Sequence, residues 1–218
     1  MKYYDRYWLS STSEELGDFA MKWPVIRIYI PKHSSQRILD YGCGKGRILK
    51  EVKRLNPRAE LGGVDVSAVA LRAAKKTLKD VQFHKITDGS RVPLRNGSLD
   101  FIIALDVIEH VYDTEQMFHE FTRMLKKGGK ILISTPFCGI IKNILVTMID
   151  YELVYDPLGP HVRYYTKKSL TKCLEDSGFE CLEWNYFGRF YPIYKGMVVL
   201  ARKTEDKYIR IKKYANWR

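Results

Sequence analysis

Short apolar runs alternate with segments of helical spacing along this 218-residue sequence, and this alternation restricts the fold more than any other feature. The apolar runs that are long enough to be buried strands cover residues 37–41, 61–66, 81–86, 99–105 and 130–134. Between them, apolar residues recur at helical spacing in residues 46–55, 67–78 and 113–128. The alternation predicts βαβ units that build a mainly parallel sheet with helices on both faces.

The same pattern continues toward the C-terminus. Residues 169–177 have helical spacing, and residues 179–187 and 196–201 are predicted to be two last strands, joined as a hairpin by residues 188–195. Ligands bind such sheets outside the carboxyl ends of the strands, where the strand order reverses. Residues that directly follow the predicted strands are therefore the candidates for a functional site.

The stretch ILDYGCGKG, residues 38–46, has three glycines at alternate positions after the first strand. Gly42, Gly44 and Gly46 allow a backbone to approach a ligand closely. A dinucleotide fingerprint has the spacing G-x-G-x-x-G, and here Arg47 stands where the third glycine would be. The spacing argues against a nicotinamide dehydrogenase, although a plain tight turn between strand and helix remains an alternative.

Three carboxylates lie at the ends of three neighbouring predicted strands. Asp40, beside the glycines, would repel a pyrophosphate but suits an ammonium or sulfonium. Asp65 can accept hydrogen bonds from a ribose diol, and Asp88 can accept from an adenine amino group. Each could be an ordinary loop aspartate, but together they predict a site for S-adenosylmethionine.

Four motifs then carry a family resemblance: ILDYGCGKGRIL (38–49), GVDVS (63–67), ITDGSRVPLRNGSLDFIIALDVIEHVYD (86–113) and LKKGGKILISTP (125–136). With them the chain resembles class I S-adenosylmethionine-dependent methyltransferases of the type-11 or ubiquinone-biosynthesis-like group. The resemblance continues more loosely through residues 161–180. It implies a Rossmann-like three-layer αβα sandwich, whose seven-stranded, mostly parallel sheet has its last strand antiparallel. It also implies methyl transfer that leaves S-adenosylhomocysteine.

The predicted cofactor-binding residues lie within these motifs. They are Asp40, Gly42, Cys43, Gly44, Gly46, Asp65, Val66, Asp88, Gly89, Leu105 and Asp106. The glycines are expected to meet the methionine part of the cofactor. Leu105 and Asp106, at the end of the fourth strand, are expected to face the sulfonium.

The stretch LDVIEHVYD, residues 105–113, combines Asp106, Glu109 and His110. Its spacing suits neither a structural zinc site nor an HExxH site, so no metal site is predicted. Glu109 and His110 are expected to orient the loop or to contact the edge of the cofactor. Some quinone-pathway relatives with a similar Glu-His pair use a divalent cation, which is an alternative. His110 and His161 are the candidate catalytic residues, with His110 a general base for an oxygen nucleophile.

The chain is expected to divide into capping helices (1–36), a methyltransferase domain (37–202) and a basic tail (203–218). An apolar insertion at residues 137–165 is predicted to cover the substrate, although a membrane-surface helix and simple packing on the core are alternatives. The N-terminal KYYDRYW either closes over the site or packs on the sheet as a capping helix.

The formal net charge of +12 fits a solvated basic surface or an acidic partner. A small-molecule methyl acceptor, amphiphilic or anionic, is favoured. RNA is a less favoured acceptor, contact with a membrane surface stays open, and a non-catalytic cofactor-binding module is a further alternative. Four scattered cysteines without CxxC spacing, and an N-terminus without an apolar signal core, predict a cytoplasmic protein with reduced thiols.

Overall fold

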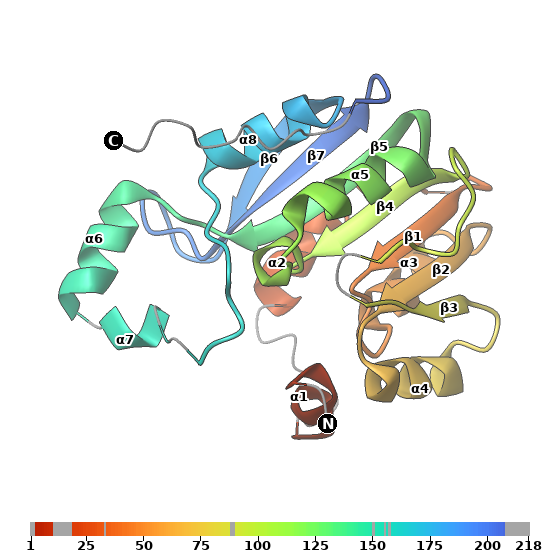
Figure 1. Ribbon diagram of the computed structural model, residues 1–218, viewed down its shortest axis with the longest axis horizontal. Helices are drawn as coiled ribbons and strands as arrows, with labels where there is room; N and C mark the ends of the chain where they lie inside the picture. The colour runs from red at the N-terminus through yellow and green to blue at the C-terminus, as the bar shows by residue number, and fades with distance from the viewer. Residues whose placement is uncertain are drawn as a thin grey trace.

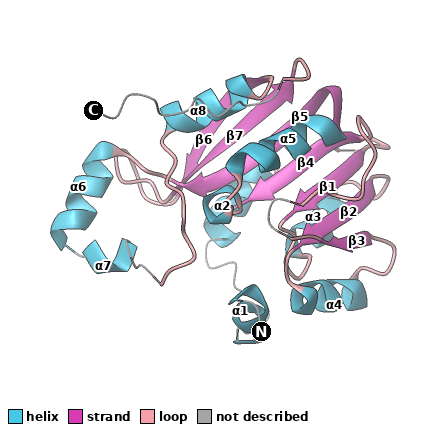
Figure 2. Cartoon of the chain, in the orientation of Figure 1, coloured by secondary structure: helices cyan, strands magenta, loops and turns pink. Residues whose placement is uncertain are grey.

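The computed structural model of the protein describes residues 3–10, 19–32, 34–87, 90–149, 151–154, 156 and 158–207. Its centre is one seven-stranded sheet with helices on both faces (Figures 1 and 2). The strands are β1 (Arg37–Tyr41), β2 (Glu60–Asp65), β3 (Gln82–Lys85), β4 (Leu99–Leu105), β5 (Leu125–Pro136), β6 (Phe179–Phe187) and β7 (Gly196–Lys203). The helices are α1 (Tyr3–Ser10), α2 (Phe19–Ile26), α3 (Arg47–Leu55), α4 (Ala68–Thr77), the short 3₁₀ helix η1 (Ile108–His110), α5 (Thr114–Met124), α6 (Ile140–Ile149), α7 (Tyr151–Val154) and α8 (Lys167–Asp176).

The strand order in the sheet is β3-β2-β1-β4-β5-β7-β6. The first five strands in this order pair in parallel, and β7 pairs antiparallel with both β5 and β6. This order confirms the predicted Rossmann-like αβα sandwich. Because the order reverses between β1 and β4, the loops after these two strands lie at the switch point, where such sheets bind ligands.

Successive residues of the central strands enter two different cores. On β4, Ile102 packs with α5 and α8 on one face of the sheet, while Phe101 and Ile103 pack with α2, α3 and α4 on the other. Strands buried on both faces must be apolar throughout, which explains why the LDFIIAL run is so easy to recognise.

The sequence prediction of a helix from residue 113 to Gly128 is wrong at its end. Asp113 does cap α5, by accepting from the amide of Gln116, but α5 ends at Met124 and β5 begins at once. The ammonium of Lys203 donates to the carbonyls of Thr122 and Leu125 at 2.6 and 2.9 Å, so it satisfies carbonyl groups that the next turn of a longer helix would have paired. Gly128, with a φ of +79°, turns within the irregular start of β5 rather than ending a helix.

The predicted insertion between β5 and α8 contains α6 and α7, which stand apart from the layers of the sandwich (Figure 1). None of the side chains of α6 is buried, so this helix does not pack on the core, although Phe137 and Tyr165 at the two ends of the insertion do. Within the described residues, no helix has the length and apolar character needed to cross a membrane.

Candidate active site

The glycine loop after β1 exposes bare backbone at the switch point. Gly42, Gly44 and Gly46 have φ angles of +79°, +52° and +82°, which glycine adopts without steric strain. The amides of Gly42 and Cys43 donate to the carbonyl of Val64 at 2.8 and 3.0 Å. The loop is therefore tied to the end of β2, and Gly46 leads directly into α3.

Asp65, the last residue of β2, is fixed by backbone amides. Its two carboxylate oxygens accept hydrogen bonds from the amides of Gly44 and Ser67, both at 2.8 Å. Burial raises the pKa of Asp65 above its ordinary value, and these two amides oppose that rise. Each carboxylate oxygen keeps further lone-pair capacity, so the group can still accept hydrogen bonds from a ribose diol.

Asp40 lies beside Asp65 in the neighbouring strand and is fully buried. One of its carboxylate oxygens has no hydrogen-bond partner among the described residues. Burial, and then the charge of Asp65, raise the pKa of Asp40 to about 8. A buried carboxylate without a partner fits a cationic ligand, which would compensate the cost of its ionisation.

Helix α1 lies against the cofactor end of this site. The carboxylate of Asp5 accepts hydrogen bonds from the hydroxyl of Ser67 at 2.7 Å and from the amide of Val69 at 3.3 Å. The indole of Trp8 covers Gly44 so closely that a Cβ atom there would lie 2.6 Å from the ring. Of the two sequence alternatives for KYYDRYW, closure over the site fits better, since α1 packs against α4 and Trp8 contacts the glycine loop.

Tyr4 of α1 points toward the turn after β4, where His110 lies. Its ring meets the ring of His110 edge to face, with 6.1 Å between the centroids. Burial, and then the neighbouring Tyr3, Glu109 and Asp65, raise the pKa of Tyr4. Tyr4 therefore stays protonated between the predicted cofactor residues and the turn after β4.

Asp106, directly after β4, has an unusual backbone held by several contacts. Its φ is +52°, which is rare for a residue other than glycine and is concentrated at functional sites. The hydroxyl of Ser134 donates to its carboxylate at 2.7 Å, and its amide donates to the carbonyl of Ser134 at 3.0 Å. Lys22, a buried lysine of α2, forms an ion pair with the same carboxylate. Its ammonium also lies 5.2 Å from the ring centroid of Phe187.

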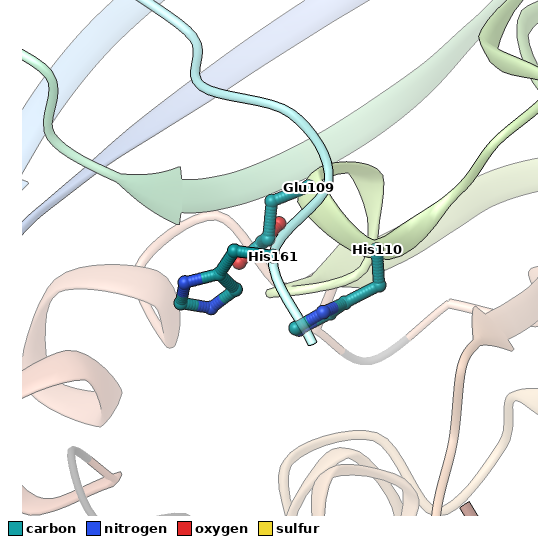
Figure 3. Close-up of side chains that lie close together, drawn as sticks. All are labelled: Glu109, His110 and His161. Carbon is teal, nitrogen blue, oxygen red and sulfur yellow. The ribbon is translucent and has the colours of Figure 1, made fainter. Parts of the chain in front are cut away.

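Glu109, His110 and His161 come together although His161 belongs to the segment before α8 (Figure 3). The amides of Val162 and Arg163 donate to the carbonyl of Glu109 at 2.9 and 3.0 Å, which ties this segment to η1. The His110 and His161 ring centroids are 4.9 Å apart. One ligand atom from each of the three residues lies within 4.8 Å of the other two.

The protonation of this cluster follows from its contacts. Nδ1 of His110 lies 2.9 Å from the carbonyl of Pro160. Because a carbonyl only accepts, Nδ1 carries the proton and Nε2 is left with a lone pair. Burial lowers the pKa of His110 and of His161, so both rings favour the neutral form. Burial raises the pKa of Glu109 to about 7, and neither of its carboxylate oxygens has a hydrogen-bond partner among the described residues.

One carboxylate and two neutral imidazoles form a donor set that fits a divalent cation. The spacing argument against a metal site considered only Asp106, Glu109 and His110, and it could not include the distant His161. The structure brings His110 and His161 together as the candidate catalytic pair, with the buried Glu109 beside them. The sequence prediction that the protein has no metal site therefore stays a prediction, and this donor set is the place to test it.

Three further predicted cofactor residues, Cys43, Val66 and Leu105, have apolar or enclosed side chains. The thiol of Cys43 is buried, and a Cβ atom on Gly63 would lie 2.8 Å from its sulfur. Burial raises the pKa of the Cys43 thiol, so the thiol stays protonated and enclosed. Any contact of Cys43 with the cofactor would therefore come from its backbone. Val66 and Leu105, at the ends of β2 and β4, are half-buried against the two cores.

Asp88 and Gly89 lie outside the described residues. Sequence reasoning missed Lys22, Asp5 and Trp8 as individual site residues. All three belong to N-terminal helices that have no fixed distance in sequence from the strand ends. A lysine within the apolar stretch FAMKWPVI was the one local signal, because buried lysines need a partner.

The family described as "Methyltransferase domain" matches residues 18–183 of the chain. One relative is the ubiquinone biosynthesis O-methyltransferase of Cupriavidus pinatubonensis, 24% identical over 184 residues, which cover 81% of this chain and 72% of that protein. The enzyme of the same name from Nitrosococcus oceani is 33% identical over 146 residues, which cover 63% of this chain and 61% of that protein. The matched part thus spans roughly three fifths to three quarters of the length of these relatives.

Solved structures show the same fold. A putative methyltransferase in complex with the Trm112 activator of Haloferax volcanii has a TM-score of 0.76 and 13% identity, covering 94% of this chain and 99% of that one. An S-adenosylmethionine-dependent methyltransferase of Mesorhizobium loti has a TM-score of 0.67 and 18% identity, covering 84% and 97%. The glycine loop, the paired Asp40 and Asp65, and the family match together show that the chain belongs to the class I S-adenosylmethionine-dependent methyltransferases.

Proposed function

We propose that this methyltransferase transfers the methyl group to a hydroxyl oxygen of a small-molecule acceptor held beside Glu109, His110 and His161. The observation that carries the proposal is the unprotonated Nε2 of His110, whose Nδ1 is fixed by the carbonyl of Pro160. This nitrogen can accept a proton, and it lies at the same edge of the sheet as the predicted cofactor residues. Relatives named as ubiquinone biosynthesis O-methyltransferases support an oxygen acceptor.

The proposed reaction is a direct displacement. The acceptor oxygen attacks the methyl carbon, an O–CH₃ bond forms, and the S–CH₃ bond breaks with its electron pair left on sulfur. The hydroxyl proton passes to Nε2 of His110, and the neighbouring Glu109 carboxylate stabilises the resulting imidazolium. Most of the acceleration comes from holding the two reactants in line, because the sulfonium is already activated.

The roles of the cofactor residues follow from their positions. We expect the ammonium of the cofactor to pair with Asp40, and the ribose diol to donate to Asp65. The amide contacts of Asp65 with Gly44 and Ser67 would hold its carboxylate in place for this task. Trp8 would close the cofactor end of the site above Gly44.

The acceptor is tested with methyl-labelled S-adenosylmethionine and separate pools of phenols, catechols, aliphatic alcohols, amines and RNA. We expect label in oxygen-methylated small molecules, identified by mass spectrometry. His110→Gln should lower kcat by about a hundredfold or more while leaving the Kd for S-adenosylmethionine unchanged. Exclusive labelling of amines or RNA, or full activity of His110→Gln, would contradict the proposal.

RNA is the second candidate acceptor, motivated by the net charge of +12 and the basic residues 203–218. RNA binding through these residues would weaken steeply with salt, because cations that neutralise phosphates release counterions. Deleting residues 203–218 should then reduce both the affinity and its salt dependence. Weak RNA binding that salt hardly changes would discard this candidate.

A further inference from the structure

Helix α6 has its apolar stripe on the outside. The apolar residues of the stripe recur at helical spacing and are Ile140, Ile141, Ile144, Leu145, Met148 and Ile149. The other side of the helix, with Lys142, Asn143 and Val146, is half-buried toward the rest of the protein. A surface helix normally does the reverse and turns its apolar stripe to the core.

The exposure of the stripe is large. Ile140, Met148 and Ile149 are 80%, 79% and 81% exposed, and no side chain of α6 is buried. Scattered exposed apolar residues are normal on protein surfaces, but a contiguous stripe of this kind marks an interaction site. Figure 1 shows α6 standing away from the sheet, so the stripe is open to a large partner.

The hairpin between β6 and β7 lies next to the start of α6. The ammonium of Lys142 donates to the carbonyls of Phe137, at 2.9 Å, and Lys195, at 3.4 Å, which fixes the base of α6 against the hairpin. At the hairpin tip, Phe190 and Tyr191 are each 71% exposed. The six residues of the α6 stripe together with Phe190 and Tyr191 are here named the apolar platform.

Cations lie near the start of α6. Arg189 and Lys195 are exposed on the hairpin, and their charges, after burial, lower the pKa of Lys142. The described acidic residues of the insertion, Glu152 and Asp156, lie beyond α6 in the chain. Exposed apolar and aromatic groups beside several cations are typical of segments that bind the interface of anionic membranes.

We propose that the apolar platform docks the protein on an anionic lipid surface, with α6 lying in the interface and Arg189 and Lys195 facing the headgroups. A second copy of the chain is a poorer occupant, because a two-fold contact through this surface would bring the same cations together. Helices α6 and α7 lie between β5 and the segment that carries His161, so docking would bring the membrane close to the acceptor end of the site. The proposal does not depend on which acceptor is methylated.

Co-sedimentation with vesicles tests the proposal, with the full chain in every arm. One set of vesicles is pure phosphatidylcholine, and the other contains phosphatidylcholine and phosphatidylglycerol in equal parts. We expect the wild type to bind the anionic vesicles at least about tenfold more strongly than the neutral ones, and binding to weaken as salt is added. Failure to bind the anionic vesicles would overturn the proposal.

Two matched variants separate the apolar platform from the general basic charge. The double variant Met148→Gln/Ile149→Gln should lose about tenfold or more of its vesicle affinity. Ile28→Gln changes another well-exposed isoleucine, outside the apolar platform, and should bind like the wild type. Unchanged S-adenosylmethionine binding and melting temperature verify that each variant is folded. Equal vesicle binding by the double variant, or a wild-type dimer in ultracentrifugation that this variant abolishes, would refute the lipid surface as occupant.

Discussion

Asp40 and Asp65 place two buried carboxylates on neighbouring parallel strands, and the charge of Asp65 adds to burial in raising the pKa of Asp40 to about 8. Asp65 is compensated by the amides of Gly44 and Ser67, whereas Asp40 keeps an oxygen without a partner. The pair is therefore asymmetric. Asp65 is positioned to accept hydrogen bonds, whereas Asp40 would ionise when a cation binds next to it.

The first prediction is that cofactor binding releases a proton. Free Asp40 is protonated below pH 8, and pairing with the cofactor ammonium requires the carboxylate. The Kd for S-adenosylmethionine should fall by up to about tenfold per pH unit as the pH rises toward 8. It should rise again above pH 8, where the cofactor's own amino group loses its proton. Calorimetry in buffers of different ionisation enthalpy measures the proton release.

The control for this prediction is Asp40→Asn, which should bind the cofactor weakly and with little pH dependence. Stability of the cofactor-free protein gives a second check. Because folding raises the pKa of Asp40, the contribution of the protonated group is fully present below its unfolded pKa of 3.8 and is lost as the pH rises through about 8. Asp40→Asn should flatten this decline. Identical pH profiles for the two proteins would contradict the assignment.

The second prediction concerns α1 as a cover over the cofactor. Trp8→Ala removes the indole that covers Gly44, and release of S-adenosylmethionine should become about tenfold faster, with little change in the association rate. Stopped-flow displacement measures the release rate. Leu9→Ala, a change to an exposed apolar residue of the same helix, is the matched control. If both variants release the cofactor at the wild-type rate, α1 does not hold it.

The third prediction is structural and concerns a buried ion pair. Arg123 of α5 pairs with Glu120 at 2.7 Å and also donates to the carbonyls of Val92 and Leu94, so it fixes the loop before β4. Arg123→Met leaves Glu120 buried without its partner and should lower the free energy of unfolding by about 3–5 kcal/mol.

The exposed pair Arg202–Glu180 is the control for Arg123. Arg202→Met should cost less than about 1 kcal/mol, because surface ion pairs contribute little. Denaturant unfolding of both variants gives the comparison. Equal losses in the two variants would show that burial does not set the importance of the Arg123 pair.

The fourth prediction concerns the pair Lys22–Asp106. Lys22→Met leaves Asp106 at its positive φ without the ammonium of α2, and the end of β4 loses a restraint next to the sulfonium site. We expect kcat to fall by about tenfold or more with a smaller change in the KM for the cofactor, because misplacement chiefly affects the transition state. Lys22→Arg should recover part of kcat. A pure loss of stability, with normal kcat in the folded fraction, would limit Lys22 to a structural role.

Much of the sheet could be predicted from the sequence. The bounds of β1 and β4 were predicted to the residue, because apolar runs between polar or glycine-rich segments define buried strands. The bounds of the half-exposed strand β6 were also predicted to the residue. The end of α5 could not be predicted, since the ammonium of Lys203, almost eighty residues later, stabilises the carbonyls where the chain turns into β5.

The cofactor half of the site could be predicted from the sequence, whereas the contacts of the acceptor half could not. Asp40 and Asp65 lie at the ends of strands whose parallel pairing could be predicted, so their proximity was predictable too. His161 joins Glu109 through hydrogen bonds from the segment before α8, and Lys22 reaches Asp106 from an N-terminal helix. Neither relationship has a periodic signature, and both depend on tertiary packing.

Calorimetric titration with S-adenosylmethionine tests the central claim most directly, with NAD as the comparison ligand and Asp65→Ala as the matched variant. The account predicts one S-adenosylmethionine bound per chain, no binding of NAD, and loss of S-adenosylmethionine binding in a variant that melts at a similar temperature to the wild type. Absence of S-adenosylmethionine binding, or binding that Asp65→Ala leaves unchanged, would contradict the account.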